Sequence, residues 1–163
     1  MYKLAIDAST AAQWQLSGEP EAERARHMLR DYAAEKVAFV APTIWHYEVA
    51  NIINKAVGTR RLAEEEGYMA FQALQALDIE FVPFPAPAEA YRLARTYRRS
   101  IYDSLYLAAA QSHQIDLWTG NRRLYNAVRQ SLPFVKWIGD YTSPKSQSAA
   151  RKVYISMAGR NAF

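Results

Sequence analysis

The stretch KLAID (residues 3–7) decides how this chain folds, because it is a short apolar run that ends in an acid. Small and polar residues follow it at once, so it predicts a buried strand that begins almost at residue 1. Residues 8–16 then predict a first helix behind that strand.

Four further apolar runs of the same kind follow along the chain: VAFVA (37–41), IEFVP (79–83), DLWT (116–119) and FVKWI (134–138). Helical patterns fill the intervals, at residues 20–36, 44–57, 62–77, 88–98, 101–112 and 122–130. We expect Pro20 at the start of the first of these helices, Thr43 as the cap of the second and Gly58 as its end. Short strands that alternate with helices predict an α/β domain with a mainly parallel sheet.

The composition bounds the class of protein. Half of the 163 residues are hydrophobic, 22% are charged and none is cysteine, which fits one globular domain. The lack of cysteine excludes disulfide frameworks, zinc–thiolate sites, iron–sulfur clusters and cysteine nucleophiles. No apolar run approaches the length of a membrane span and the N-terminus has no signal-peptide pattern, so we expect a soluble cytoplasmic protein without membrane association.

The net charge of +4 comes from one end of the chain. Residues 143–163 hold four bases and no acid, which leaves 16 bases against 16 acids in residues 1–142. We therefore expect a single domain over 1–142, followed by a basic tail over 143–163. Three interpretations of that tail stay open: a disordered tail, a partner-binding arm or an artificial extension.

Three acidic residues lie within or next to apolar segments of the sequence. Asp7 ends the first predicted strand, whereas Glu48 lies in the apolar run WHYEVANII and Asp103 in IYDSLYLAAA. In an open α/β sheet, ligands bind at the carboxyl ends of the strands, where we expect these acids to meet. Each has a plainer alternative: Asp7 as a helix cap, Asp103 in a capping box with Ser100, and Glu48 in an ion pair with an arginine.

If the three carboxylates converge, only a cation makes their arrangement stable. Ligands without histidine or cysteine suit a hard ion such as Mg²⁺ or Mn²⁺. Such ions take part of their coordination from a substrate phosphate, which points to phosphodiester chemistry.

Four motifs carry a resemblance to a known family: IDAS around Asp7, PTIWHYEVAN around Glu48, SIYDSLYLAAA around Asp103 and LWTGNRRL around Asn121. In this order they cover residues 3–138, and the chain resembles the PIN-domain nucleases, most closely the VapC-type toxins of toxin–antitoxin pairs. The resemblance implies a three-layer α/β/α fold with a five-stranded parallel sheet. It also implies an acidic Mg²⁺ or Mn²⁺ site, cleavage of RNA, a homodimer and a cognate antitoxin as partner, with no organic cofactor.

One position departs from the family pattern, because Asn121 in Thr119-Gly120-Asn121 stands where the family usually has a fourth acid. An amide ligates through its carbonyl oxygen but brings no charge. Asn121 is also a good cap for the helix after it. Two functions therefore stay open: a metal-dependent ribonuclease, and a weakened module that binds RNA or an antitoxin without cutting. A phosphoryl-accepting domain is a third, disfavoured because Lys136 is the only lysine near the last two strands.

We assign the predicted catalytic residues as follows: Asp7 and Asp103 hold the ion, and Glu48 binds it through water or orients the attacking water. Asn121, Ser9 and Thr119 support these ligands. Arg122 and Arg123 hold the RNA backbone or form a solvated helical turn.

Other features have structural interpretations. We interpret the aromatic residues of the helices and strands as core or dimer interface rather than as platforms for bases. His46 is predicted to have a surface or packing role. Four arginines, at positions 92, 95, 98 and 99, are predicted to share one solvated helix face. The helices at 20–36 and 62–77 are candidates for a groove that accepts an antitoxin segment.

Overall fold

The structure, a computed structural model, describes residues 1–83 and 86–144. Its centre is a five-stranded sheet in the order β3-β2-β1-β4-β5, and every neighbouring pair is parallel. The strands are β1 (Tyr2–Ile6), β2 (Val37–Pro42), β3 (Ile79–Val82), β4 (Leu117–Thr119) and β5 (Val135–Trp137). This confirms the predicted α/β class and its parallel sheet.

Seven α-helices connect the strands within the described ranges. They are α1 (Ala8–Gln15), α2 (Ala22–Ala33), α3 (Trp45–Gly58), α4 (Glu64–Gln75), α5 (Pro87–Tyr97), α6 (Ile101–His113) and α7 (Arg122–Val128). A single 3₁₀ turn at Ile138–Asp140 follows β5.

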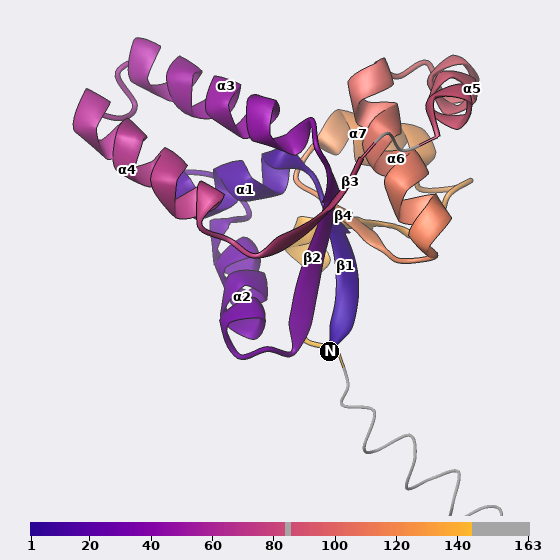
Figure 1. Ribbon diagram of the computed structural model, residues 1–163, viewed down its shortest axis with the longest axis horizontal. Coiled ribbons are helices and arrows are strands. Elements are labelled where there is room, and N and C mark those ends of the chain that lie inside the picture. Colours follow the sequence, from indigo (N-terminus) through magenta and orange to yellow (C-terminus); the bar gives the residue numbers. More distant parts are fainter. Residues whose placement is uncertain (84–85, 145–163) are drawn as a thin grey trace, which may run out of the picture.

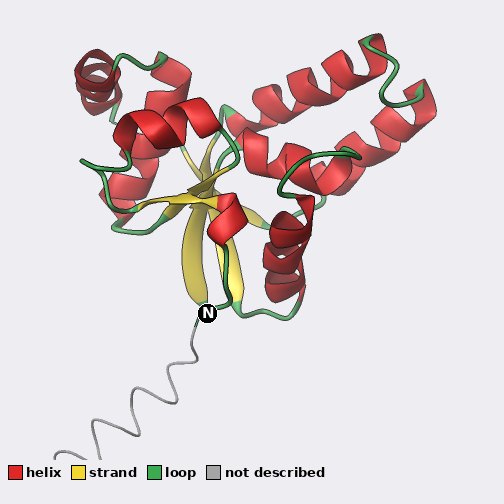
Figure 2. Cartoon of the chain, turned by 180° about the vertical axis from the view of Figure 1, so that it is seen from behind, coloured by secondary structure: helices red, strands yellow, loops and turns green. Residues whose placement is uncertain are grey.

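The sheet separates the helices into two outer layers. Strands β1, β2 and β3 follow one another in one direction across the sheet, whereas β4 and β5 extend it in the other. Because crossover connections between parallel strands are right-handed, the two directions place their helices on opposite faces. Figure 1 shows α1–α4 to the left of the strands and α5–α7 to the right, and Figure 2 shows the same division from behind. The architecture is a three-layer α/β/α sandwich.

The core forms where the central strand meets its neighbours. β1 pairs with β2 through Leu4 and Phe39 and with β4 through Ala5 and Leu117, and all four side chains are buried. Layers on both faces of the sheet explain why KLAID is apolar without alternation. β1 is the middle strand of the sheet, between β2 and β4, so its carboxyl end lies near the centre of the molecule.

Some predicted boundaries were wrong by one or two residues. α2 begins at Ala22, after a turn that contains Pro20, and Glu21 is its first flanking residue without a side-chain cap. α3 is preceded by Ile44 rather than capped by Thr43, and it includes Gly58. Local signals fix the existence of a helix better than its first residue, because helix ends depend on neighbouring packing.

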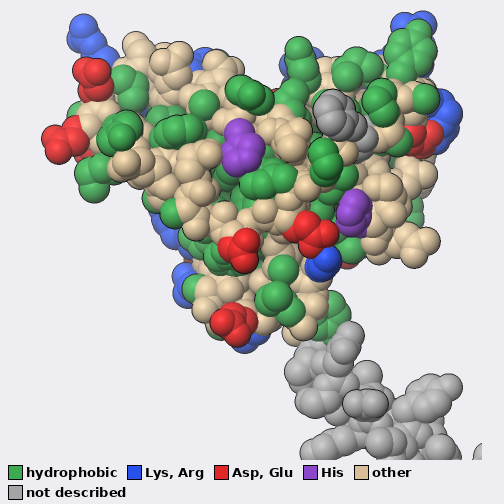
Figure 3. All heavy atoms as spheres, viewed as in Figure 1, with side chains coloured by type: hydrophobic (Ala, Val, Ile, Leu, Met, Phe, Trp, Pro, Cys, Tyr) green, Lys and Arg blue, Asp and Glu red, His purple; other side chains and the backbone are tan. Residues whose placement is uncertain are grey.

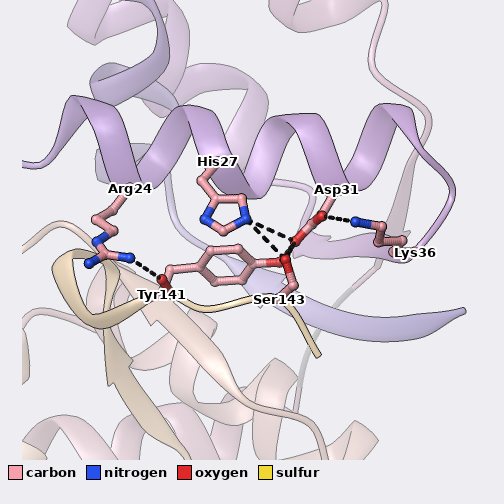
Figure 4. Close-up of polar contacts among 6 residues, drawn as sticks. All are labelled: Arg24, His27, Asp31, Lys36, Tyr141 and Ser143. Carbon is pink, nitrogen blue, oxygen red and sulfur yellow. Dashed lines mark hydrogen bonds and ion pairs between the residues drawn. The ribbon is translucent and has the colours of Figure 1, made fainter. Parts of the chain in front are cut away.

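The end of the described chain is fixed to α2 by a buried carboxylate, which Figure 4 shows. Asp31 accepts hydrogen bonds from Lys36 Nζ (2.8 Å), Tyr141 Oη (3.0 Å) and Ser143 Oγ (2.5 Å). His27, one turn earlier, lies 3.0 Å through Nε2 from the Ser143 hydroxyl. These contacts hold the segment that follows β5 against the helical layer.

The division between residues 1–142 and 143–163 stays a prediction, because residues 145–163 lie outside the described part of the chain. Within the described ranges, no helix is both long enough and apolar enough to span a membrane.

Candidate functional site

A cleft opens where the order of the sheet reverses. β1 and β4 are neighbours, but the connections after them lead to opposite edges, so their carboxyl ends leave a crevice between the helical layers. The cleft has a volume of about 160 Å³. Its lining residues are Asp7, Ala8, Ser9, Glu48, Asn51, Ile52, Asp103, Tyr106 and Asn121.

Asp7 is the anchor of the cleft, and it is only 5% exposed. It caps α1, because its Oδ1 accepts from the backbone N–H of Thr10 at 2.9 Å, which confirms the capping interpretation. The same oxygen accepts from Ser9 Oγ at 2.6 Å, and Oδ2 accepts from the Thr119 hydroxyl. The carboxylate is therefore held in one orientation by three residues.

Two hydroxyl groups connect the ends of β1 and β4 through Asp7. Ser9 Oγ, which donates to Asp7, accepts from the backbone N–H of Gly120 at 2.9 Å. Thr119 Oγ1, which also donates to Asp7, accepts from the backbone N–H of Asn121 at 2.9 Å. A Cβ on Gly120 would lie 3.1 Å from the Ser9 carbonyl oxygen, so glycine permits this close approach. The predicted supporting roles of Ser9 and Thr119 fit these positions.

Glu48 reaches the cleft from the first turn of α3. Its Oε2 accepts a hydrogen bond from Tyr106 Oη at 2.5 Å, so its partner is a tyrosine and not the arginine considered from the sequence. Burial raises the pKa of Glu48, the hydrogen bond from Tyr106 lowers it, and the charges of Asp7 and Asp103 raise it further. Burial is the largest cause of the net rise, and the charges of the two aspartates act in the same sense.

Asp103 and Asn121 meet at the opposite wall. Asn121 Oδ1 caps α7 by accepting from the backbone N–H groups of Arg123 (3.1 Å) and Leu124 (3.2 Å). This fixes the amide so that Nδ2 donates to Asp103 Oδ1 at 3.4 Å. Ser100 caps α6 by accepting from the Asp103 N–H at 3.0 Å, but the Asp103 carboxylate turns toward Asn121. Asn121 thus orients Asp103 in addition to capping a helix.

The described residues that line the cleft offer oxygen ligands and no positive charge. It contains three carboxylates and two amides, and no lysine or arginine stands among the lining residues. In the described ranges none of the three carboxylates has a salt-bridge partner. Burial also raises the pKa of Asp7, although its hydroxyl and backbone hydrogen bonds offset part of the rise.

The donor set fits a hard divalent cation in chemistry, since such ions select carboxylate and amide oxygens. The present arrangement is looser than a formed metal centre. Across residues 1–83 and 86–144, no three His, Cys, Asp or Glu side chains converge closely enough to hold an ion. Glu48 and Asp103 each keep one side-chain hydrogen bond to the described residues, whereas Asp7 is fixed by several.

The predicted basic residues lie outside this lining. The Arg122 guanidinium stacks 3.6 Å over the Trp137 ring and lies 3.5 Å from Glu21. Arg123 contributes its backbone N–H to the cap of α7, and its side chain is exposed. His46 bonds Gln75 through Nδ1 at 2.9 Å, which places it in packing between α3 and α4 as predicted.

Two polar lining residues, Tyr106 and Asn51, were not among the predicted site residues. Both follow a predicted carboxylate at a distance of three residues, Tyr106 after Asp103 and Asn51 after Glu48. Residues three apart on a helix share a face, so this spacing is the signal that could have identified them.

Several solved structures share the fold of this chain. The chain is similar to PAE2754 from Pyrobaculum aerophilum, with 17% identity, a TM-score of 0.62 and coverage of 98% of both chains. VapC20 from Mycobacterium tuberculosis, described as a Sarcin-Ricin loop cleaving toxin, has 17% identity and a TM-score of 0.57, over 77% of this chain and 95% of that one. A toxin–antitoxin complex from Klebsiella pneumoniae has 17% identity and a TM-score of 0.50, over 88% and 99%. At such identities the likeness shows the fold alone.

A comparison with curated protein sequences found no match. The family model of the PIN domain, in contrast, matches residues 4–130, which include the acidic residues of the cleft and Asn121. The chain therefore belongs to the PIN domain family, whose members are generally nucleases.

Proposed function

We propose that this protein is a metal-dependent endoribonuclease and the toxin of a toxin–antitoxin pair. One observation carries the proposal: Asp7, Glu48 and Asp103 come from three separate elements and line one cleft. Among the described residues, no lysine or arginine lines it. Unneutralised carboxylates that face one another are unfavourable in a folded protein unless a cation joins them.

The residues proposed to hold the ion are Asp7, Asp103 and Glu48, and the ion is Mg²⁺ or Mn²⁺. When bound, such an ion makes water more acidic and neutralises charge on the phosphate that is attacked. The hydrogen bonds from Ser9, Thr10 and Thr119 hold Asp7 in a fixed orientation, so Asp7 is the ligand around which the others assemble.

Glu48 is proposed to take the proton of the attacking water. Its raised pKa suits a general base, because a carboxylate with a higher pKa accepts a proton more readily. Tyr106 donates to Oε2 and thereby sets which carboxylate oxygen is free to act. Asn121 keeps the Asp103 carboxylate turned toward the cleft.

RNA as the substrate and an antitoxin as the partner are supported by the family and by its structural neighbours. VapC20 is described as a toxin that cleaves the Sarcin-Ricin loop, and another neighbour is a toxin–antitoxin complex. We extend both properties to this chain, together with a homodimer and a cytoplasmic location, as parts of the proposal.

The test is cleavage of a mixed RNA pool and a matched DNA pool by the full-length protein, with Mn²⁺ or with EDTA. We expect cleavage of RNA that requires the metal and falls at least about 100-fold in Asp7→Asn, because the substitution removes the anchoring charge. Tyr91→Phe, on the exposed surface of α5, is the matched control.

Other outcomes distinguish the alternatives. Cleavage that persists in EDTA would contradict the metal site, and cleavage of DNA alone would contradict the substrate. Binding of RNA without any cleavage would favour the weakened module that Asn121 suggested.

A further inference from the structure

Two exposed tyrosines directly precede two carboxylates of the cleft. Tyr47 stands before Glu48 in the first turn of α3, and Tyr102 stands before Asp103 in the first turn of α6. Their exposed fractions are 77% and 58%. Burial of a large aromatic ring is energetically favourable. Two such rings exposed to solvent beside one cleft therefore indicate a surface that binds a ligand.

Helical spacing places both rings beside the opening of the cleft. Tyr47 lies four residues before Asn51, and Tyr102 lies four residues before Tyr106. Residues four apart share a helix face, and both Asn51 and Tyr106 line the cleft. Each tyrosine therefore extends a wall of the cleft outward by one turn, from α3 on one side and from α6 on the other. On the side of the molecule viewed in Figure 1, Figure 3 shows apolar side chains over both groups of helices.

The described walls of the cleft offer few groups that could bind a phosphate backbone. Within residues 1–83 and 86–144, no positively charged side chain lines the cleft, and the described lining presents acidic and amide groups to a nucleic acid. Arg98 and Arg99 stand just before α6, five and four residues ahead of Asp103. Neither guanidinium has a carboxylate within 4.0 Å in the described ranges, unlike that of Arg92, which pairs with Glu89.

The predicted stripe of four arginines is interrupted after Tyr97, at the end of α5. Its last two members, Arg98 and Arg99, are therefore free to contact a phosphate backbone. α5 ends at Tyr97, and Arg98 takes a left-handed backbone conformation with φ of 52°. The chain therefore turns before α6, and only Arg92 and Arg95 remain on the exposed face of α5. Arg98 and Arg99 instead lie next to the turn of helix that carries Tyr102.

We propose that Tyr47 and Tyr102 stack on bases on either side of the bond that is cleaved, and that they restrict the substrate to single-stranded RNA. This inference rests on the ribonuclease function proposed above. Stacking of a base on an aromatic ring tolerates any sequence, because every base presents a π-face. In a duplex the bases already stack on one another and cannot reach two rings on separate helices.

The experiment measures kcat and KM for a mixed-sequence single-stranded RNA pool and for the same pool annealed to its complement, with Mn²⁺. The variants are Tyr47→Leu and Tyr102→Leu, which keep an apolar side chain without a ring, and Tyr47→Phe and Tyr102→Phe, which keep the ring. Tyr91→Leu on α5 and Tyr68→Leu on α4 are matched controls, since these tyrosines are 62% and 64% exposed and do not line the cleft.

We expect each leucine variant at Tyr47 or Tyr102 to raise KM for single-stranded RNA at least about fivefold, with kcat nearly unchanged. The phenylalanine variants and both controls should retain the KM of the wild type, and the duplex should be cleaved poorly by every form.

Three results would overturn the inference. One is leucine variants with the same KM as the controls. Another is equal cleavage of duplex and single strand by the wild type. The third is a changed oligomeric state in sedimentation without a change in KM, which would make the tyrosines an interface between copies of the chain. In all three the wild type still cuts RNA, whereas a wild type that cuts no RNA removes the proposed function as well.

Discussion

Two aspartates are almost equally buried in this molecule but have opposite surroundings. Asp7 at the cleft is 5% exposed and Asp31 on α2 is 2% exposed. Asp7 receives hydrogen bonds from hydroxyl groups and one backbone N–H, and it has no basic partner within the described ranges. Asp31 pairs with the ammonium group of Lys36 and accepts from two hydroxyl groups.

The pKa values differ accordingly. Burial raises the pKa of Asp7, and its hydrogen bonds offset only part of the effect. Burial acts on Asp31 in the same sense, but the hydrogen bonds from Lys36, Ser143 and Tyr141 and the charge of Lys36 outweigh it and lower its pKa. Lys36 compensates the charge of Asp31, whereas within the described ranges no basic side chain compensates the charge of Asp7.

The largest effect that separates the two aspartates should appear in the stability of Asp31→Asn. We expect a loss of about 2 kcal/mol in the free energy of unfolding, because the ion pair with Lys36 and its charged hydrogen bonds disappear. Chemical denaturation measures this loss, and cleavage of RNA by the folded variant should be unchanged. Asp7→Asn is the matched comparison: without metal it should lose less than about 0.5 kcal/mol, since the change relieves repulsion. Equal losses of stability in both variants would contradict the proposed difference between a structural Asp31 and a ligand-binding Asp7.

Metal binding should stabilise the cleft by a somewhat smaller amount. At a Mn²⁺ concentration of about ten times Kd, binding to the native state contributes about 1.4 kcal/mol, or an increase in Tm of roughly 3–6 °C. Thermal denaturation with Mn²⁺ and with EDTA measures the shift. Asp31→Asn should keep it and Asp7→Asn should lose it. A shift of the same size in Asp7→Asn would place the ion elsewhere.

Asn121→Asp should strengthen metal binding at the cleft. The carboxylate retains the cap of α7 and adds a negative charge beside Asp103, so we expect Mn²⁺ affinity to rise roughly three- to tenfold. Titration calorimetry measures the change, with Asn121→Ser as a control that keeps a capping oxygen without the charge. An unchanged or weaker affinity would mean that the amide itself is needed to orient Asp103.

The smallest effect is the pH dependence of the contribution of Asp31. A carboxyl group whose pKa is lowered by folding stabilises the native state fully above its ordinary value of 3.8, and the contribution fades as the pH falls through the lowered pKa. The stability difference between wild type and Asp31→Asn should therefore be constant near neutral pH and shrink in acid. A difference that grows as the pH falls would contradict the lowered pKa.

The sequence predicted the fold and the members of the cleft better than their contacts. Five apolar runs gave five strands, because burial on both faces of a sheet requires continuous apolar residues. The acids at positions 7, 48 and 103 were predicted to meet, and all three line the cleft. The partner of Glu48 was not predictable, since Tyr106 lies 58 positions away on another helix.

The sequence by itself determined the alternation of strands and helices, the placement of acids in apolar surroundings and the caps at Asp7, Ser100 and Asn121. These features depend on residues within a few positions of one another. Only the tertiary structure decided that the sheet order reverses between β1 and β4 and that Tyr106 bonds Glu48. It also decided that Asp31 pairs with Lys36, whereas Asp7 has no basic partner among the described residues. Those outcomes depend on contacts between distant segments, which form only when the layers pack together.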